Sequence, residues 1–145
     1  MVEASKRRIV VGIDASKPSR AALRWAADEA RPGDHVEVVH SWNLNAIAGL
    51  EAPHLNSATF EVEASRLLRE AVDEVIDPAR GRELDVSFSP VHGHPAEVLI
   101  ERSADADLIV VGRRGQGGFK RMLLGSVSRD LVQHAACPVV VVPAD

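Results

Sequence analysis

The sequence predicts an α/β protein: a single-domain, doubly wound sheet of five parallel strands with helices on both faces. Short apolar runs alternate with longer stretches of helical spacing in the order βαβαβαβαβ, which is typical of parallel sheets with crossover helices. Several short runs are apolar at every position, as in strands covered on both faces. The chain has 145 residues, 46% of them apolar, so it can bury one core and is interpreted as one domain over residues 1–145.

Five runs are the expected strands, at residues 9–13, 36–40, 86–91, 108–111 and 139–142. The first, fourth and fifth are continuously apolar, which indicates burial on both faces. The third reads Val-Ser-Phe-Ser-Pro-Val, so it alternates apolar and polar residues and contains Pro90. Because proline has no N–H to give to a ladder, this strand is expected at an edge of the sheet.

Four amphipathic helices are expected between the strands, at residues 22–30, 64–76, 96–103 and 127–135. The second repeats apolar residues at i, i+3, i+4 and i+7. Pro18 and Pro95 stand near helix starts, where proline is tolerated, whereas Gly33 and Pro138 stand beyond helix ends.

The bulk composition narrows the class of function. The net charge is −4, and a general nucleic-acid binder would instead carry a basic face across the domain. No apolar run reaches the length of a membrane span, and the basic N-terminus is not followed by the apolar segment of a signal peptide. Cys137 is the single cysteine of the sequence and cannot form an internal disulfide, so we expect a reducing, cytoplasmic location without membrane or nucleic-acid partners.

The stretch between the fourth strand and the last helix is rich in glycine and positively charged. From Gly112 to Arg129 it carries five cationic side chains and no acid. Glycines permit a close backbone approach, and a helix N-terminus attracts anions, so the chemistry favours phosphate. The stretch matches neither the Walker A pattern nor a strict G-x-G-x-x-G fingerprint. From loop chemistry alone, a surface connection or contact with a nucleic acid stays open as well.

The same stretch resembles the ATP-binding signature of the universal stress protein family, G-x2-G-x9-G-[ST]. Gly112, Gly115, Gly125 and Ser126 occupy its fixed positions. Other pieces resemble the family in the same order along the chain, at residues 8–16, 38–42, 93–97 and 136–143. The first of these pieces departs slightly from the family, because Ala15 stands where a glycine is usual.

This resemblance covers almost the whole chain and implies a strand order of 3-2-1-4-5. It also implies bound ATP, with Mg²⁺, and a role in nucleotide-dependent signalling or stress adaptation. The family commonly dimerises through the last strand, here Val139, Val140, Val141 and Val142. That strand is an apolar edge without a protecting lysine or bulge, so pairing with its own copy is expected on physical grounds too.

The implied strand order places a ligand crevice between the first and fourth strands, beyond their carboxyl ends. Asp14 follows the first strand, where its carboxylate could accept a hydrogen bond from a ribose hydroxyl or help to hold a magnesium ion. Alternatively, Asp14 only caps the next helix. The resemblance places adenine near Ser41 and the backbone around Ile13, although the family often has an apolar residue at the Ser41 position. The predicted nucleotide-binding residues are Gly12, Ile13, Asp14, Ser41, Gly112, Arg113, Arg114, Gly115, Gly117, Gly118, Gly125, Ser126, Val127 and Ser128.

These residues have different expected roles. Gly115 and Gly118 would let the loop backbone approach phosphates. Gly125 and Ser126 would present N–H groups and a hydroxyl at the helix N-terminus, and Ser128 would add a second hydroxyl. Ser126 as a plain N-cap is compatible with this role.

Two alternatives concern charge and catalysis. Arg113 and Arg114 either pair with phosphate or remain solvated. A slow Mg²⁺-dependent ATPase or phosphotransferase that uses Asp14 is the second functional hypothesis, and a partner-binding module without nucleotide is the third. The sequence shows no dedicated general base beside the loop and no G-x-S-x-G nucleophile elbow, so no catalytic residue is assigned.

The remaining reactive side chains are expected to be structural. His40, His92 and His94 have no acidic or cysteine cluster beside them in sequence, so they are interpreted as solvated or core histidines rather than metal ligands. Cys137 is interpreted as a small buried hydrophobic residue rather than a nucleophile.

Overall fold

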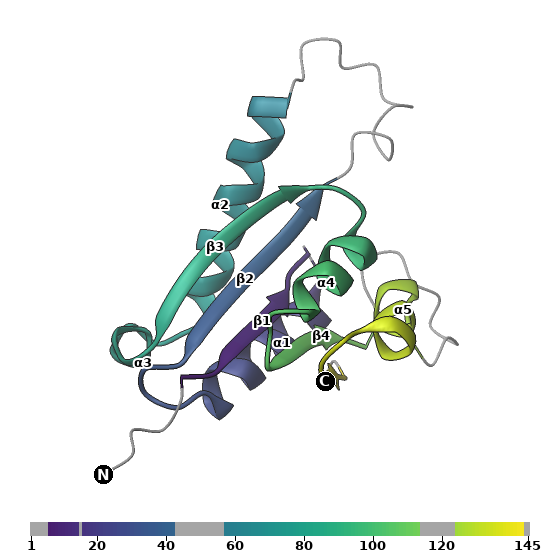
Figure 1. Ribbon diagram of the computed structural model, residues 1–145. Coiled ribbons are helices and arrows are strands. Elements are labelled where there is room, and N and C mark those ends of the chain that lie inside the picture. The colour runs from purple at the N-terminus through teal and green to yellow at the C-terminus, as the bar shows by residue number, and fades with distance from the viewer. Residues whose placement is uncertain (1–5, 15, 43–56, 114–123, 144–145) are drawn as a thin grey trace.

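The computed structural model describes residues 6–14, 16–42, 57–113 and 124–143 (Figure 1). The elements, in chain order, are β1 (Arg8–Gly12), α1 (Lys17–Glu29), β2 (His35–Trp42), α2 (Ser57–Val75), α3 (Pro78–Glu83), β3 (Asp85–His92), α4 (Pro95–Ser103), β4 (Leu108–Gly112), α5 (Ser126–His134) and β5 (Val139–Val142). The strands form one parallel sheet in the order β3-β2-β1-β4-β5. The predicted α/β fold and strand order are therefore confirmed.

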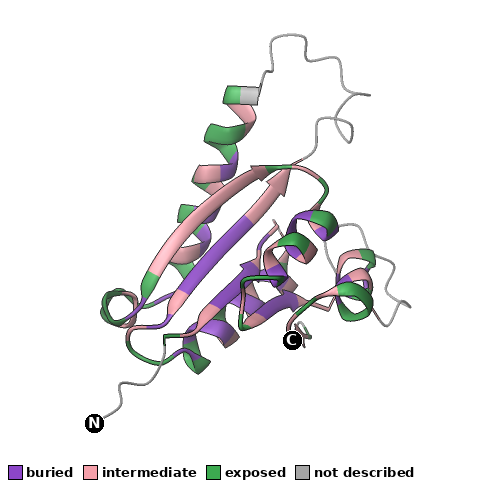
Figure 2. Cartoon of the chain, in the orientation of Figure 1, coloured by how far each residue is buried: buried purple, intermediate pink, exposed green. Residues whose placement is uncertain are grey.

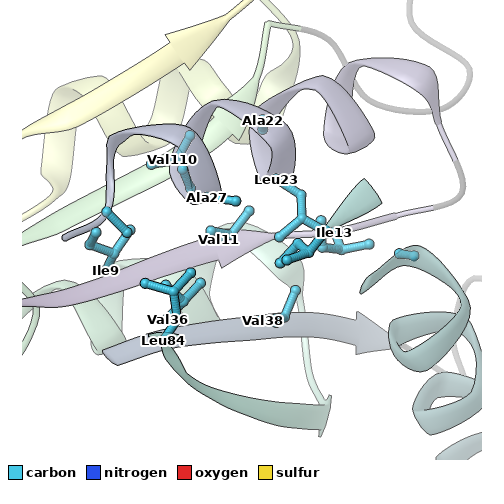
Figure 3. Close-up of a cluster of buried hydrophobic side chains, with 14 of the residues drawn as sticks. Ile9, Val11, Ile13, Ala22, Leu23, Ala27, Val36, Val38, Leu84 and Val110 are labelled. Carbon is cyan, nitrogen blue, oxygen red and sulfur yellow. The ribbon is translucent and has the colours of Figure 1, made fainter. Parts of the chain in front are cut away.

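Helices cover both faces of the sheet. α1 and α2 lie on one face, and α4 and α5 lie on the other (Figure 1). Alternate residues of β1 divide between the two layers: Ile9 and Val11 pack with α1 and α2, whereas Val10 packs with α4 and α5. Figure 3 shows the first cluster, in which Leu23 of α1 lies over β1. Two-sided burial explains why Ile9, Val10 and Val11, the buried residues of this strand, are all apolar.

The two edge strands are less buried than the central ones, and Figure 2 shows this for β3. β3 is half-buried or exposed at every position and contains Pro90, as its sequence predicted. All four residues of β5 are half-buried, because β5 pairs only with β4. The outer side of β5 is therefore a row of backbone groups with no strand beside it in the single chain.

The described residues contain five helices, not the four predicted. The additional one, α3, is short and has no buried residue, so no apolar periodicity marks it. Its start is nevertheless conventional: Asp77 is the N-cap, its Oδ1 accepts from the Ala79 N–H at 2.8 Å, and Pro78 is the first helical residue. The second predicted helix also begins earlier than expected, at Ser57 instead of Ala64.

Two buried carboxylates hold the amino-terminal ends of the strands. Asp34 is 3% exposed and accepts from the backbone N–H groups of Arg7 and Arg31. Glu37, also 3% exposed, pairs with Arg8 at 2.8 Å and with Arg102 of α4. Burial alone would raise the pKa of Glu37, but the hydrogen bond from Arg8 and the neighbouring positive charges outweigh it, so this pKa lies below its ordinary value.

The described helices include none that combines the length and the apolar character needed to cross a membrane.

Candidate functional site

A pocket lies beyond the carboxyl ends of β1 and β4, where the order of the sheet reverses. Its lining residues are Gly12, Ile13, Asp14, Ser16, Ser19, Val39, His40, Ser41, Pro95, Leu99, Val111, Gly112, Val127 and Ser128. The volume is about 100 Å³, below the roughly 300–1,000 Å³ of sites that enclose a drug-sized ligand. The space between these walls is therefore smaller than a site that encloses a whole ligand of that size.

The turn after β1 places Asp14 at this pocket. Asp14 Oδ1 accepts from the Ser16 N–H at 2.7 Å, and the Ser19 hydroxyl donates to the Asp14 carbonyl at 2.9 Å. Ser16, not Asp14, is the N-cap of α1, and its side chain accepts from the Ser19 N–H. Asp14 therefore does not cap the helix directly; its carboxylate closes the turn that leads into it.

Two glycines allow the surrounding elements to approach closely. A Cβ on Gly112 would lie 2.6 Å from Pro18 Cβ and 2.7 Å from the Pro18 carbonyl carbon, so the first turn of α1 occupies that space. A Cβ on Gly12 would lie 2.9 Å from Leu99 Cδ1, the tip of a side chain. In this structure Gly112 thus serves the packing of α1 against β4, a role that the sequence analysis did not assign to it.

The backbone of Ile13 is already engaged. Its N–H donates to Val39 O at 2.8 Å, and its carbonyl accepts from His40 Nδ1 at 2.8 Å. Beyond this point β1 has ended while β2 continues to Trp42. Along a strand, the backbone groups of successive residues point alternately to its two sides. The carbonyl of Val39 bonds to Ile13 on the β1 side, and the carbonyl of Trp42 bonds to Gly93 on the β3 side. The N–H and carbonyl of Ser41 therefore point to the β1 side, beyond the last hydrogen bond between β1 and β2.

The amino end of α5 closes the opposite side. Gly125 is the N-cap, and its N–H donates to the Arg113 carbonyl at 2.8 Å, so that N–H is used within the protein. The buried Ser128 hydroxyl donates to the same carbonyl at 2.9 Å. Ser126 is exposed, is the first helical residue and is not the N-cap. The first-turn N–H groups of Ser126, Val127 and Ser128 have no carbonyl one turn earlier inside the helix.

The structure brings half of the predicted site residues together. Those lining the pocket are Gly12, Ile13, Asp14, Ser41, Gly112, Val127 and Ser128. Three others stand at the α5 end but do not line it: Arg113, Gly125 and Ser126. Arg114, Gly115, Gly117 and Gly118 lie outside the described residues.

Sequence reasoning missed several lining residues. Ser19 is 4% exposed and ties the Asp14 turn to α1, and its position three residues after Ser16 is a signal for such a turn. His40 lines the pocket through a tertiary contact to Ile13, which no local pattern indicates. Pro95 and Leu99 come from α4, on the opposite face of the sheet from α1.

The described residues contain no group of three or more His, Cys, Asp or Glu side chains that could hold a metal ion. Asp14 is the one carboxylate among the described residues that line the pocket. His92 stacks on Trp42 with ring centroids 4.5 Å apart, and His94 is exposed at the start of α4. Burial raises the pKa of the half-buried Cys137 thiol, and the Asp107 carboxylate raises it further, so the thiol stays protonated at neutral pH.

This pocket defines a class: a doubly wound parallel sheet with a pocket at the switch point, bordered by a carboxylate on one side and a helix N-terminus on the other. Comparison with known proteins narrows the class. The model of the universal stress protein family matches residues 6–143, and the chain belongs to this family.

Curated and solved relatives agree with this assignment. Universal stress protein Rv2005c of Mycobacterium tuberculosis is 38% identical over 134 residues, which are 92% of this chain and 44% of that protein. The chain thus spans about half the length of the curated relatives it matches. The solved structure of hypothetical protein MJ0577 shares the fold, with a TM-score of 0.78 and 24% identity over 96% of each chain. A universal stress protein solved in complex with cAMP gives a TM-score of 0.65 and 26% identity over 98% of this chain and 100% of that one.

Proposed function

We propose that this protein binds an adenine nucleotide, ATP with Mg²⁺, in the switch-point pocket and acts as a nucleotide-dependent regulator in stress adaptation. The observation that carries the proposal is one pocket that gathers Asp14, the end of β2 and the N-terminus of α5. The similar universal stress protein whose solved structure contains cAMP supports an adenine nucleotide as the class of ligand. The protein is proposed to work as a cytoplasmic homodimer.

The base is proposed to lie at the β2 end of the pocket. The edge of adenine presents one hydrogen-bond donor and several acceptors. The backbone N–H and carbonyl of Ser41 point to the β1 side beyond the end of β1, where no strand pairs with them, so they could bond to that edge. Val39 and Leu99 supply apolar surface beside that position. The half-buried Ser41 side chain is small, so recognition through the backbone is preferred to packing of the base against it.

The phosphates are proposed to lie at the α5 end. The first-turn N–H groups of Ser126, Val127 and Ser128 and the positive end of the helix dipole favour an anion there. The glycine-rich residues 114–118, which lie outside the described part, are proposed to wrap the phosphates. Asp14, between the β2 end and the α5 end of the pocket, is proposed to accept a hydrogen bond from a ribose hydroxyl.

Asp14 is also the residue that would reach a magnesium ion carried by the nucleotide. A single carboxylate suits Mg²⁺, which keeps several waters and binds through one or two carboxylates together with phosphates. When bound, the ion would neutralise phosphate charge. The protein's own part would be to hold this carboxylate in the turn that the Ser16 N–H closes.

Regulation is favoured over turnover because Asp14, proposed above to contact ribose and Mg²⁺, is the one described carboxylate that lines the pocket, so no second described carboxylate is available there as a base. The direct test is the identity of the small molecule released when freshly purified protein is denatured, together with thermal melts in ATP, ADP, AMP, cyclic AMP and adenosine. Binding of ATP is expected to raise the melting temperature by mass action. If no adenine nucleotide is released and none shifts the melt, the proposal fails. A single-turnover incubation that hydrolyses bound ATP would favour the slow ATPase instead.

A further inference from the structure

A serine, a histidine and an aspartate form a hydrogen-bonded chain at the opposite end of the sheet. Ser87 Oγ lies 3.0 Å from His35 Nε2, and His35 Nδ1 lies 2.9 Å from Asp85 Oδ2. His35 begins β2 and Asp85 begins β3, whereas the switch-point pocket lies beyond the carboxyl ends of the strands. The two sites are therefore distinct.

Sheet geometry brings the three residues together. His35 and Asp85 are Cα partners in the β2–β3 register, and Ser87 follows Asp85 by two residues on the same face of β3. This is the face to which Val39 and Val91 belong and on which α4 covers β1 and β2. The serine is half-buried, and the histidine and aspartate side chains are 30% and 73% exposed, so a small solute can reach the group.

The arrangement is held by backbone bonds. The Asp85 N–H donates to Asp34 O at 2.9 Å, and the His35 N–H donates to Arg7 O at 2.9 Å. The buried Asp34 carboxylate in turn accepts from Arg7 and Arg31. The ends of β2 and β3 are thus fixed in relation to each other, which pre-organises the side chains that they carry.

The order of partners fixes the roles of the ring nitrogens. An ionised carboxylate can only accept, so the bond to Asp85 requires the proton on Nδ1. In the neutral imidazole, Nε2 is then an acceptor, and it faces the Ser87 hydroxyl at a distance suited to taking its proton. Nucleophile, base and orienting carboxylate follow in the order that nucleophilic catalysis requires.

We propose that Ser87 is a nucleophile activated by His35, with Asp85 as the positioning residue, and that the group accepts acyl groups from small activated esters. A hollow of about 350 Å³ lies on the same face, lined by Arg8, Val91, His92, Val98, Glu101, Arg102 and Asp105. The three residues of the group are not among these lining residues, so an ester would reach them from solvent, through the exposed side chains of His35 and Asp85.

The proposed reaction consumes only the ester and one water molecule. Ser87 Oγ attacks the ester carbonyl carbon while its proton passes to His35 Nε2. The bond from that carbon to the alcohol oxygen breaks, and the alcohol leaves with the proton returned by His35. Water then attacks the acyl-serine with His35 as the base, which releases the carboxylic acid and restores the Ser87 hydroxyl.

The test is incubation with p-nitrophenyl acetate, in which nitrophenolate release is followed and acetylated peptides are mapped by mass spectrometry. The parent protein is expected to carry acetyl on Ser87. Ser87→Ala should lose this label and slow the protein-dependent release about 100-fold, the low end of general-base catalysis because the site is exposed to water. His35→Gln should lose the label too.

The matched control is Ser89→Ala. Ser89 lies two residues further along the same face, but its hydroxyl donates to the carboxylate of Glu37, at 2.6 Å from Oε2. This variant should label as the parent does. Asp85→Asn should slow acetylation and Asp85→Glu should recover part of it, because only the latter keeps a carboxylate for Nδ1–H.

Two outcomes would overturn the proposal: a parent protein without acetyl on Ser87, or a Ser87→Ala variant that releases nitrophenolate as fast as the parent. Either result would leave a polar cross-strand contact that only stabilises the edge of the sheet. If Ser87→Ala folds poorly, Ser87→Cys replaces it in the test. The thiol of this variant is expected to be acetylated at least as readily as the serine, which would show that this position is reactive. The proposal does not depend on nucleotide binding, so added ATP should change none of these results.

Discussion

Asp14 combines two tasks that a single substitution can separate. Its carboxylate closes the turn into α1 and lines the proposed nucleotide pocket. A residue that only closes a turn affects stability, whereas one that contacts ribose or metal also affects affinity.

We therefore expect Asp14→Ala to weaken ATP binding by roughly 1–3 kcal/mol, the range for a hydrogen bond to a charged group. Asp77→Ala is the matched control: Asp77 Oδ1 also accepts a hydrogen bond from the N–H two residues further on, but Asp77 is the N-cap of α3 and does not line the pocket. The control should lose about 1 kcal/mol of stability with its affinity unchanged. Calorimetric titration measures the ATP affinity of both variants, and urea melts measure their stability. If Asp14→Ala binds ATP as tightly as the parent does, Asp14 is not part of the binding site.

Glu37 should make the stability of the fold sensitive to acid. Its pKa in the folded state lies below the ordinary 4.5, so between the two values the unfolded chain binds a proton that the folded chain does not. Its contribution to stability is present above about pH 4.5 and is lost as the pH falls through the folded pKa.

The unfolding free energy of the parent should therefore fall more steeply with acid than that of Glu37→Gln. The variant itself should be roughly 1–3 kcal/mol less stable at neutral pH, because Arg8 and Arg102 lose a charged partner. Urea melts from neutral pH down to about pH 3 measure both quantities. Parallel curves for parent and variant would show that Glu37 titrates alike in the folded and unfolded chain.

At the scale of elements, apolar patterning predicted the strands because the core decides where they lie. It placed the ends less well. β2 begins at His35 and includes Glu37, and a charged residue in a buried strand is tolerated only because Arg8 and Arg102 reach it from other elements. α3 was missed because it buries nothing, although Asp77 and Pro78 are a recognisable helix start.

The candidate site was predictable in part for the same reason. The glycine spacing and strand order located the crevice, but the contact of His40 with Ile13 and that of Gly112 with Pro18 depend on tertiary packing. Neither has a local signal in the sequence.

The packing of Gly112 gives a prediction for the junction of α1 and β4. Gly112→Ala should cost about 1–3 kcal/mol, because its Cβ would meet backbone atoms of Pro18 that cannot rotate away. Gly12→Ala should cost less, because it meets the end of the Leu99 side chain. Gly81→Ala is the unstrained reference: its Cβ would meet Ile76 Cγ2 at an ordinary 3.8 Å, and alanine is favoured over glycine inside α3, so the stability should be kept or raised. Denaturant unfolding ranks the three, and an equal cost for the first two would contradict this account of the junction.

For the whole molecule, the outer edge of β5 is the feature that favours a second copy. Ile109 N–H donates to Pro138 O and Arg113 N–H donates to Val142 O, so alternation turns the backbone groups of Val139 and Val141 away from β4. Two such edges can pair across a two-fold axis.

We predict a homodimer in which Val141→Pro shifts the equilibrium towards monomer while the fold is kept, since the lost N–H points outward. Val140→Pro is the contrasting variant: it removes an N–H on the β4 side and should destabilise the chain itself. Sedimentation at micromolar concentration, with thermal melts, separates the two effects. A parent protein that sediments as a monomer would argue against the dimer.

The most direct test of nucleotide binding at the switch point is calorimetric titration of Ser126→Asp. Ser126 is exposed and begins α5, so a negative charge there suits the helix dipole and should leave the fold as stable or raise its stability by about 0.3–1 kcal/mol. The same charge would stand where the phosphates are proposed to lie. We predict that the parent binds ATP, that the variant binds it at least about tenfold more weakly, roughly 1.4 kcal/mol, and that adenosine, which has no phosphate, binds both alike. Equal affinity of parent and variant for ATP would contradict the proposed site.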